Sequence, residues 1–267
     1  MPIKRTLELR SISNDEFTRI DAAVIKFAYA TQNHFGRLFD ERVYENHLAS
    51  LLRAAGFSVQ TQVPVRLTHA NFEKTYILDL VVDEMLYELK VVNEMTTAHE
   101  VQALNYAMLQ NIPLVKLINF GGDKVTGQLL RNALTPECRY QLAVDDSNWR
   151  PLGPQCRNLV GLVKSLLHDW GTNLDFRAYN EALIHHFGGV GVCLRRTVLQ
   201  SDGLCLGTHL VQHHDSHFAF VVTGFTHSQV NHRRHLNVLL QHATDINGIQ
   251  WINFNQSTLE LATVARE

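Results

Sequence analysis

The pattern of hydrophobic and polar positions in the first half of the chain changes repeatedly between helical and strand periods. Apolar residues recur three and four positions apart in some segments, which is typical of helices with one buried face. In other segments they alternate with polar residues, or they form short runs rich in β-branched and aromatic side chains, which is typical of strands. The predicted elements are, in chain order, helices at 13–33 and 40–55, strands at 58–67, 76–82 and 85–92, a helix at 98–110 and a strand at 114–120.

This order predicts an α/β fold with a mixed sheet. The strands at 76–82 and 85–92 are separated by the short turn Asp83-Glu84, so we expect them to pair antiparallel. The next two strands have a helix between them, and such a connection is typical of a parallel crossover. The expected core is therefore α-β-β-β-α-β.

Three charged residues interrupt the apolar runs of two neighbouring predicted strands. They are Asp79, Glu88 and Lys90. Glu88 and Lys90 are two residues apart on one strand, so their side chains point to the same face. A buried charge is costly unless it is paired or binds a metal. The three groups would form either a structural ion pair or a site for a hard divalent cation beside a lysine.

The predicted helices supply further polar groups. Glu45 lies on the helix 40–55 beside its apolar stripe, where it is either a solvated helix residue or a group that reaches into the site. His99, Gln102 and Tyr106 share one face of the helix 98–110, because they are three and seven positions apart.

These residues, in this order, resemble the PD-(D/E)XK nuclease superfamily. Within it, the segment from about Phe35 to Phe120 looks like the GxxExxY proteins, relatives of archaeal Holliday-junction resolvases and RecB-type nucleases. Leu38 stands where that family has its signature glycine, and Leu78 stands at the proline that names the superfamily. The matching pieces are Glu41-Arg-Val-Tyr44-Glu45, Leu78-Asp79-Leu80, Tyr87-Glu88-Leu89-Lys90, His99-Glu-Val-Gln102, Tyr106 and Ile118-Asn119-Phe120.

The resemblance implies a restriction-endonuclease-like core that hydrolyses phosphodiester bonds in DNA, including branched and single-stranded forms. It implies that Asp79 and Glu88 hold Mg²⁺ or Mn²⁺ and that Glu45 completes the metal site. Lys90 would orient the attacking water and contact the phosphate.

The resemblance also places groups of the helix 98–110 in the site. Gln102 and Tyr106 would line it, and His99 is a further substrate-binding candidate. Resolvase-like relatives act as dimers, so the resemblance also implies a homodimer or an intrachain pseudo-dimer.

The second half of the chain repeats landmarks of the first half. Asp40-x-Arg42-x-Tyr44 recurs as Asp175-x-Arg177-x-Tyr179, and Ile118-Asn-Phe120 recurs as Ile252-Asn-Phe254. We interpret this recurrence as an internal duplication. We expect a nuclease-like domain at 1–134, a linker at 135–155, where aspartates, prolines and a glycine cluster, and a second domain at 156–267.

The second copy loses the charges of the first. Glu45 aligns with Asn180, Glu88 with Val221 and Lys90 with Thr223, while Asp79 falls nearest His209. We therefore expect a degenerate domain that does not cleave. Several of the chain's 15 histidines cluster in this half, and they favour a polar surface over a zinc site because no cysteine pair accompanies them.

Composition sets limits on the function. The net charge of -2 gives no overall basic excess, so contact with nucleic acid has to be local. No apolar run reaches the ~20 residues of a membrane span, and four scattered cysteines are typical of a reducing cytoplasm. The alternatives to a nuclease are a non-catalytic nucleic-acid-binding module and a protein-interaction module on the same fold.

Overall fold

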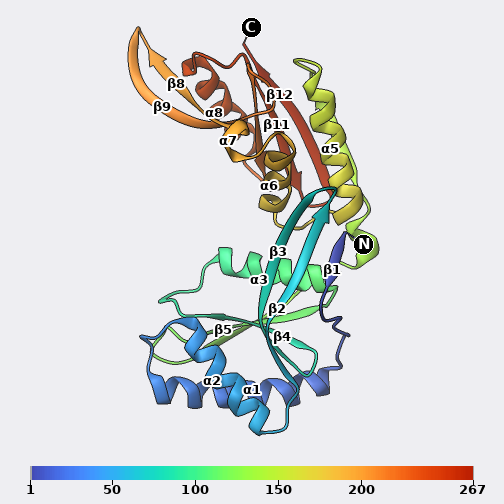
Figure 1. Cartoon of the computed structure of the whole chain (residues 1–267), viewed down its shortest axis with the longest axis vertical. Helices are drawn as coiled ribbons and strands as arrows, with labels where there is room; N and C mark the ends of the chain where they lie inside the picture. The colour runs from blue at the N-terminus through green and yellow to red at the C-terminus, as the bar shows by residue number, and fades with distance from the viewer. Residues whose placement is uncertain (1, 267) are drawn as a thin grey trace. The chain divides into compact units, whose positions relative to one another are not determined.

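The computed structural model describes residues 2–266, which form two compact units (Figure 1). Unit 1 contains the residues up to Thr68 together with Glu73–Pro136. Unit 2 contains His69–Phe72 and the residues from Glu137 onward, so the tip of one unit 1 hairpin is counted with unit 2. Each unit is built around its own six-stranded sheet.

Unit 1 has a mixed sheet in the strand order β1-β2-β3-β4-β5-β6. Strand β4 pairs antiparallel with β3 and parallel with β5, as the sequence predicts. All seven elements expected from the sequence are confirmed within a few residues, and β1 and β6 are additional. The elements are β1 (Ile3–Arg5), α1 (Asn14–Phe35), α2 (Glu41–Ala54), β2 (Val59–His69), β3 (Phe72–Val82), β4 (Met85–Lys90), α3 (Thr97–Gln110), β5 (Leu114–Asn119) and β6 (Thr126–Arg131).

The first two helices hold the sheet of unit 1 by their apolar faces. Helix α1 begins with a capping box in which Ser13 and Glu16 each bond the other's backbone N–H, and such a cap stabilises a helix by about 1 kcal/mol. Ile20 of α1 and Leu48 of α2 are buried with Leu80 of the sheet in one cluster. This packing fixes α2 over the part of the sheet that carries the charged residues.

Unit 2 has the strand order β7-β12-β11-β10-β9-β8. Strand β10 pairs parallel with β11, and helix α8 connects them. The elements are α4 (Pro136–Arg139), β7 (Ala143–Asn148), α5 (Gln155–Trp170), α6 (Phe176–His186), α7 (Val190–Cys193), β8 (Leu194–Ser201), β9 (Leu204–His213), β10 (Phe218–Thr223), α8 (Gln229–His242), β11 (Gly248–Asn255) and β12 (Thr258–Ala265).

The two units share one arrangement of five strands. The order β2-β3-β4-β5-β6 of unit 1 corresponds to β8-β9-β10-β11-β12 of unit 2, each preceded by two long helices and interrupted by a crossover helix. The sixth strands differ, because β1 lies beside β2 whereas β7 lies beside β12. The mixed α/β architecture with mixed sheets is consistent with the PD-(D/E)XK fold expected from the sequence.

The segment 135–155, expected to be a linker, contains secondary structure. Helix α4 lies in it, and strand β7 pairs parallel with β12. The sequence Ala-Val-Asp-Asp-Ser-Asn of β7 is exposed at every position, so it carries none of the alternation by which strands are recognised. None of the helices among residues 2–266 combines the length and apolarity that crossing a membrane requires.

Candidate functional site

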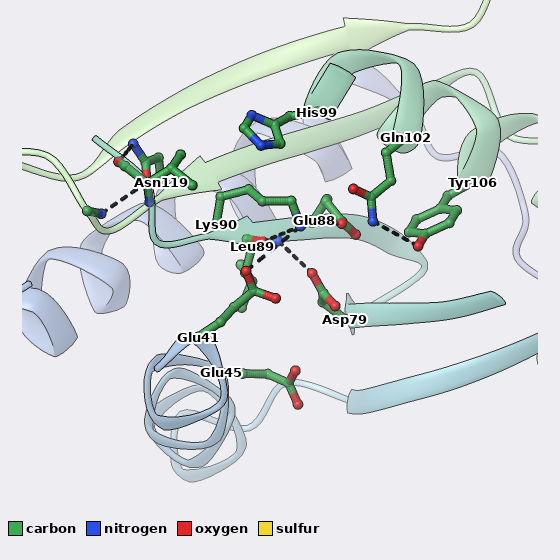
Figure 2. Close-up of polar contacts among 12 residues, drawn as sticks. Glu41, Glu45, Asp79, Glu88, Leu89, Lys90, His99, Gln102, Tyr106 and Asn119 are labelled. Carbon is green, nitrogen blue, oxygen red and sulfur yellow. Dashed lines mark hydrogen bonds and ion pairs between the residues drawn. The ribbon is translucent and has the colours of Figure 1, made fainter. Parts of the chain in front are cut away.

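Asp79 and Glu88 meet where strands β3 and β4 diverge. Leu80 pairs with Tyr87 in the antiparallel ladder, so Asp79 and Glu88 are the next residues along their strands. At this point the side chain of Asp79 replaces the backbone as acceptor, and its Oδ2 receives the N–H of Leu89 at 2.9 Å. Because the strands diverge here, the carboxylates of Asp79 and Glu88 face each other, as Figure 2 shows.

Lys90 lies beside Glu88 on the same face of β4. Its Nζ donates to Glu88 Oε1 at 2.6 Å and to the carbonyl of Leu89 at 2.8 Å. Glu88 is fully buried, and burial together with the nearby Asp79 carboxylate raises its pKa to about 9, although Lys90 opposes the shift. Burial lowers the pKa of Lys90, but the neighbouring carboxylates outweigh it and raise the pKa overall. The Asp79 and Glu88 carboxylates therefore favour a positive charge beside them.

Helix α2 brings two glutamates to this site. Glu41 Oε2 lies 3.8 Å from Lys90 Nζ, whereas Glu45 accepts hydrogen bonds from Arg42 at 2.8 Å and from Gln62 at 2.6 Å. Burial raises the pKa of both glutamates, and the Asp79 carboxylate adds to the rise. Figure 2 shows both carboxylates on the side of α2 that faces Asp79 and Lys90.

Glu41 is the site residue that the sequence analysis did not propose. We selected only Glu45, which is one turn further along the same face of α2. Two signals for Glu41 are its spacing of four residues from Glu45, because residues at that spacing are neighbours on a helix surface, and its place at the start of the matching segment Glu41-Arg-Val-Tyr44-Glu45. A helix glutamate four residues from another is usually solvated, so the pattern alone did not separate Glu41 from an exposed residue.

Helix α3 contributes a pair from the opposite side. Gln102 Nε2 donates to the Tyr106 hydroxyl at 2.9 Å. Burial raises the pKa of Tyr106 to about 12, and the Glu88 carboxylate adds to this rise, so the phenol is near the acidic groups. His99 has a local role, because its Nδ1 accepts the backbone N–H of Thr96 at 3.0 Å at the start of α3.

The donor set fits a hard cation. Glu88 Oε2 is buried, receives no hydrogen bond from a protein donor and lies beside the Asp79 carboxylate, a costly arrangement that a bound cation would relieve. The raised pKa of Glu88 beside Asp79 has the same cause, because two close carboxylates favour a shared positive charge. Within residues 2–266 no three His, Cys, Asp or Glu side chains already stand in a metal-holding arrangement. Binding would require side-chain rotation, for which Glu88 Oε2 is available.

The positions of unit 2 that align with Glu88 and Lys90 carry uncharged side chains. Val221 and Thr223 lie on β10 as Glu88 and Lys90 lie on β4. The Thr223 hydroxyl donates to Asn253 Oδ1 at 2.7 Å and accepts from the Trp251 indole at 2.8 Å. His209 is exposed on β9. Asn253 also donates to Glu260 Oε2 at 2.7 Å, so one carboxylate borders the network, but the positions that align with Glu88 and Lys90 carry no charge.

The comparisons with known proteins bear on unit 1. No curated protein and no solved structure matches the chain. A family model, however, matches residues 18–131, a range that runs from within α1 to the end of β6 and holds every charged group of the unit 1 site described above. That model describes the PD-(D/E)XK nuclease superfamily, so this part of the chain is similar to nuclease domains of that superfamily.

Proposed function

We propose that the protein is a metal-dependent DNA nuclease whose unit 1 hydrolyses phosphodiester bonds. The observation that carries the proposal is the convergence of Asp79, Glu88 and Lys90, with a buried oxygen on Glu88 that receives no hydrogen bond from a protein donor. Asp79 and Glu88 would hold Mg²⁺ or Mn²⁺, and Glu41 or Glu45 would complete the site from α2. Mg²⁺ keeps several positions for water and substrate, so two or three protein carboxylates are sufficient.

The residues of the site have separable tasks. When bound, the cation neutralises charge on the scissile phosphate and makes a water molecule more acidic. Lys90 places a positive charge beside that phosphate, where electrostatic stabilisation of the transition state is strongest. Gln102 and Tyr106 would contact the DNA strand, and His99 has a weaker claim because its ring caps α3.

We further propose that unit 2 is a degenerate copy of unit 1. Two buried ring pairs support this proposal: Tyr44 stacks on Phe120 with centroids 4.8 Å apart, and Tyr179 stacks on Phe254 with centroids 4.4 Å apart. Each tyrosine hydroxyl also donates to the carbonyl of the glycine that ends the preceding helix, at 2.9 Å and 2.6 Å. In the GxxExxY and resolvase-like interpretation, unit 2 would stand in for a second subunit.

Cleavage assays test the proposal directly. Purified full-length protein should nick or cut branched, single-stranded or duplex DNA with Mg²⁺ or Mn²⁺, and chelation should stop the reaction. Lys90→Ala should leave the substrate intact, whereas the matched unit 2 variant Thr223→Ala should cleave like wild type. If wild type and Lys90→Ala leave identical products on all three forms of DNA, the proposed site does not cleave DNA.

A further inference from the structure

The tip of the β2–β3 hairpin, which is part of unit 2, packs against aromatic side chains at the end of α5 and in α6. We call this group of side chains the aromatic seat. Phe72 is 7% exposed, and its ring lies 5.9 Å from that of Trp170 and 5.5 Å from that of His185. His69, on the other side of the two-residue turn, contacts Asp169 with Nδ1 and Oδ2 2.6 Å apart. The tip thus supplies an apolar anchor and a polar partner, and the seat is formed by the end of α5 and by α6.

Unit 1 has a counterpart of this seat at the end of α1. Phe35 ends α1 as Trp170 ends α5. Phe35 packs against Tyr44 with ring centroids 6.4 Å apart, and Trp170 packs against Tyr179 at 5.5 Å. The two corners therefore carry equivalent aromatic pairs. We call the unit 1 version, formed by His34, Phe35, Leu38 and Phe39, the α1–α2 corner.

The α1–α2 corner is uncovered. Leu38 is 92% exposed and Phe39 is 48% exposed, although Leu174, which occupies the place of Phe39 in unit 2, is only 5% exposed. His34, at the position of Asp169, is also exposed. Two adjacent large apolar side chains with this exposure, beside a half-buried phenylalanine, form an apolar surface that marks an interaction site.

The hairpin of unit 2 that corresponds to β2–β3 has an exposed tip. Strands β8 and β9 form a long hairpin that extends beyond the other strands of unit 2 (Figure 1). Leu204 follows the two-residue turn Asp202-Gly203 as Phe72 follows Ala70-Asn71, yet Leu204 is 66% exposed. Further along β9, Leu206 and Leu210 are also exposed, at 55% and 49%.

We propose that the β8–β9 hairpin tip of one copy of this chain docks on the α1–α2 corner of a second copy. The chain already contains one hairpin tip held by aromatic side chains, and it leaves one apolar hairpin tip and one apolar corner exposed. A second copy supplies the missing partner for both. The polar groups are also complementary, because the exposed Asp202 of the tip would meet the exposed His34 of the corner, so the carboxylate and the imidazole exchange sides relative to the His69–Asp169 pair. Because each copy carries one tip and one corner, a pair of copies offers two identical contacts. The inference does not depend on the proposed chemistry.

Light scattering on the full chain at tens of micromolar tests this interface. Wild type should have the mass of a dimer. Leu204→Asp at the tip and Leu38→Asp at the corner should each raise the dissociation constant about tenfold or more, because a buried unpaired carboxylate is costly. Val230→Asp is the matched control, since Val230 is 85% exposed on α8 away from the hairpin, and it should stay dimeric.

Mixing the two variants separates this docking mode from others. A chain with a damaged tip still has an intact corner, and a chain with a damaged corner still has an intact tip, so an equimolar mixture should regain dimeric mass through one contact. Circular dichroism spectra identical to that of wild type would establish that both variants are folded. A monomeric wild type overturns the proposal. The proposal is also overturned if Leu204→Asp loses the dimer while Leu38→Asp keeps it, or if the equimolar mixture of the two variants does not associate.

Discussion

Strands β4 and β10 occupy the same place in two sheets and carry opposite chemistry. Both pair parallel with the strand after a crossover helix, and both are largely buried. Glu88 and Lys90 on β4 make an ion pair beside a second carboxylate, whereas Val221 and Thr223 on β10 make apolar and hydroxyl contacts. The fold therefore does not require the charges, which cost free energy to bury. Their presence in unit 1 indicates a use other than stability.

Both units also have an asparagine that bonds the backbone after the strand at this position. Asn119 bonds both backbone groups of Val92, at 3.0 and 2.8 Å, and Asn253 bonds both backbone groups of Phe225, each at 2.8 Å. These amides tie the segment after β4 or β10 to the neighbouring strand. Because they occur with and without the charged site, we assign them a structural role.

The largest expected effect is on cleavage by unit 1. Glu88→Gln should reduce the rate by about 10²–10³-fold or more, because it removes a carboxylate from the proposed cation site. The matched change Val221→Ala in unit 2 should leave the rate unaltered. Rates are measured under single-turnover conditions with Mn²⁺. Equal losses in the two variants would mean that the activity does not reside in unit 1.

The next effect is on stability in the presence of the cation. Mn²⁺ at 100 times its dissociation constant should stabilise the folded chain by about 2.7 kcal/mol, because it binds the native state selectively. Asp79→Asn should lose most of this gain, as followed by the melting temperature with and without Mn²⁺. A full gain in Asp79→Asn would place the bound ion elsewhere.

The pH dependence of unit 2 should be controlled by buried histidines. Burial lowers the pKa of His214 from 6.5 to about 4, although Asp215 opposes the shift. A group with a lowered folded-state pKa contributes stability above its unfolded pKa and loses it as pH falls through the folded value. Unit 2 should therefore lose on the order of 1–3 kcal/mol between pH 6.5 and 4, after allowance for partial solvent screening.

The three tryptophans make this loss measurable, because Trp149, Trp170 and Trp251 all lie in unit 2. Denaturant unfolding followed by their fluorescence reports on that unit. His214→Phe should reduce the loss at low pH, since its ring is surrounded by Phe187, Phe218 and Phe220. A pH profile identical to that of wild type would show that His214 titrates normally.

The smallest effect tests the structural repeat. Tyr44→Phe and Tyr179→Phe each remove a hydroxyl that satisfies a glycine carbonyl, so each should cost about 1–2 kcal/mol. We expect similar losses in the two units, measured by circular dichroism during urea unfolding. A loss in only one of them would mean that the two tyrosines are not equivalent.

The sequence predicted the parts of the fold that a strong local pattern marks. Buried β4 and β5, and helices α1 and α2 with their glycine-terminated apolar stripes, were found because burial leaves a period in the sequence. Strand β6 was missed because its residues are exposed or half-buried at a sheet edge, and pairing with β5 alone defines it. Its polar sequence has no period to detect.

Prediction of the site had a similar limit. The pairing of Glu88 with Lys90 followed from their spacing on one strand, and the placement of Asp79 followed from the hairpin. Which glutamate of α2 approaches Lys90 depends on how the helix packs over the sheet, and sequence spacing does not fix that rotation. The histidines were expected on the surface, yet His213 and His214 are 3% and 6% exposed, because aromatic neighbours distant in sequence enclose them.

The central claim is that the charged positions of unit 1 hold a divalent cation and the corresponding positions of unit 2 do not. Anomalous diffraction from a crystal soaked in Mn²⁺ measures this directly. We predict a peak between Asp79 and Glu88, and no peak beside Val221 and Thr223. A saturating soak that leaves the space between Asp79 and Glu88 without a peak would contradict the claim.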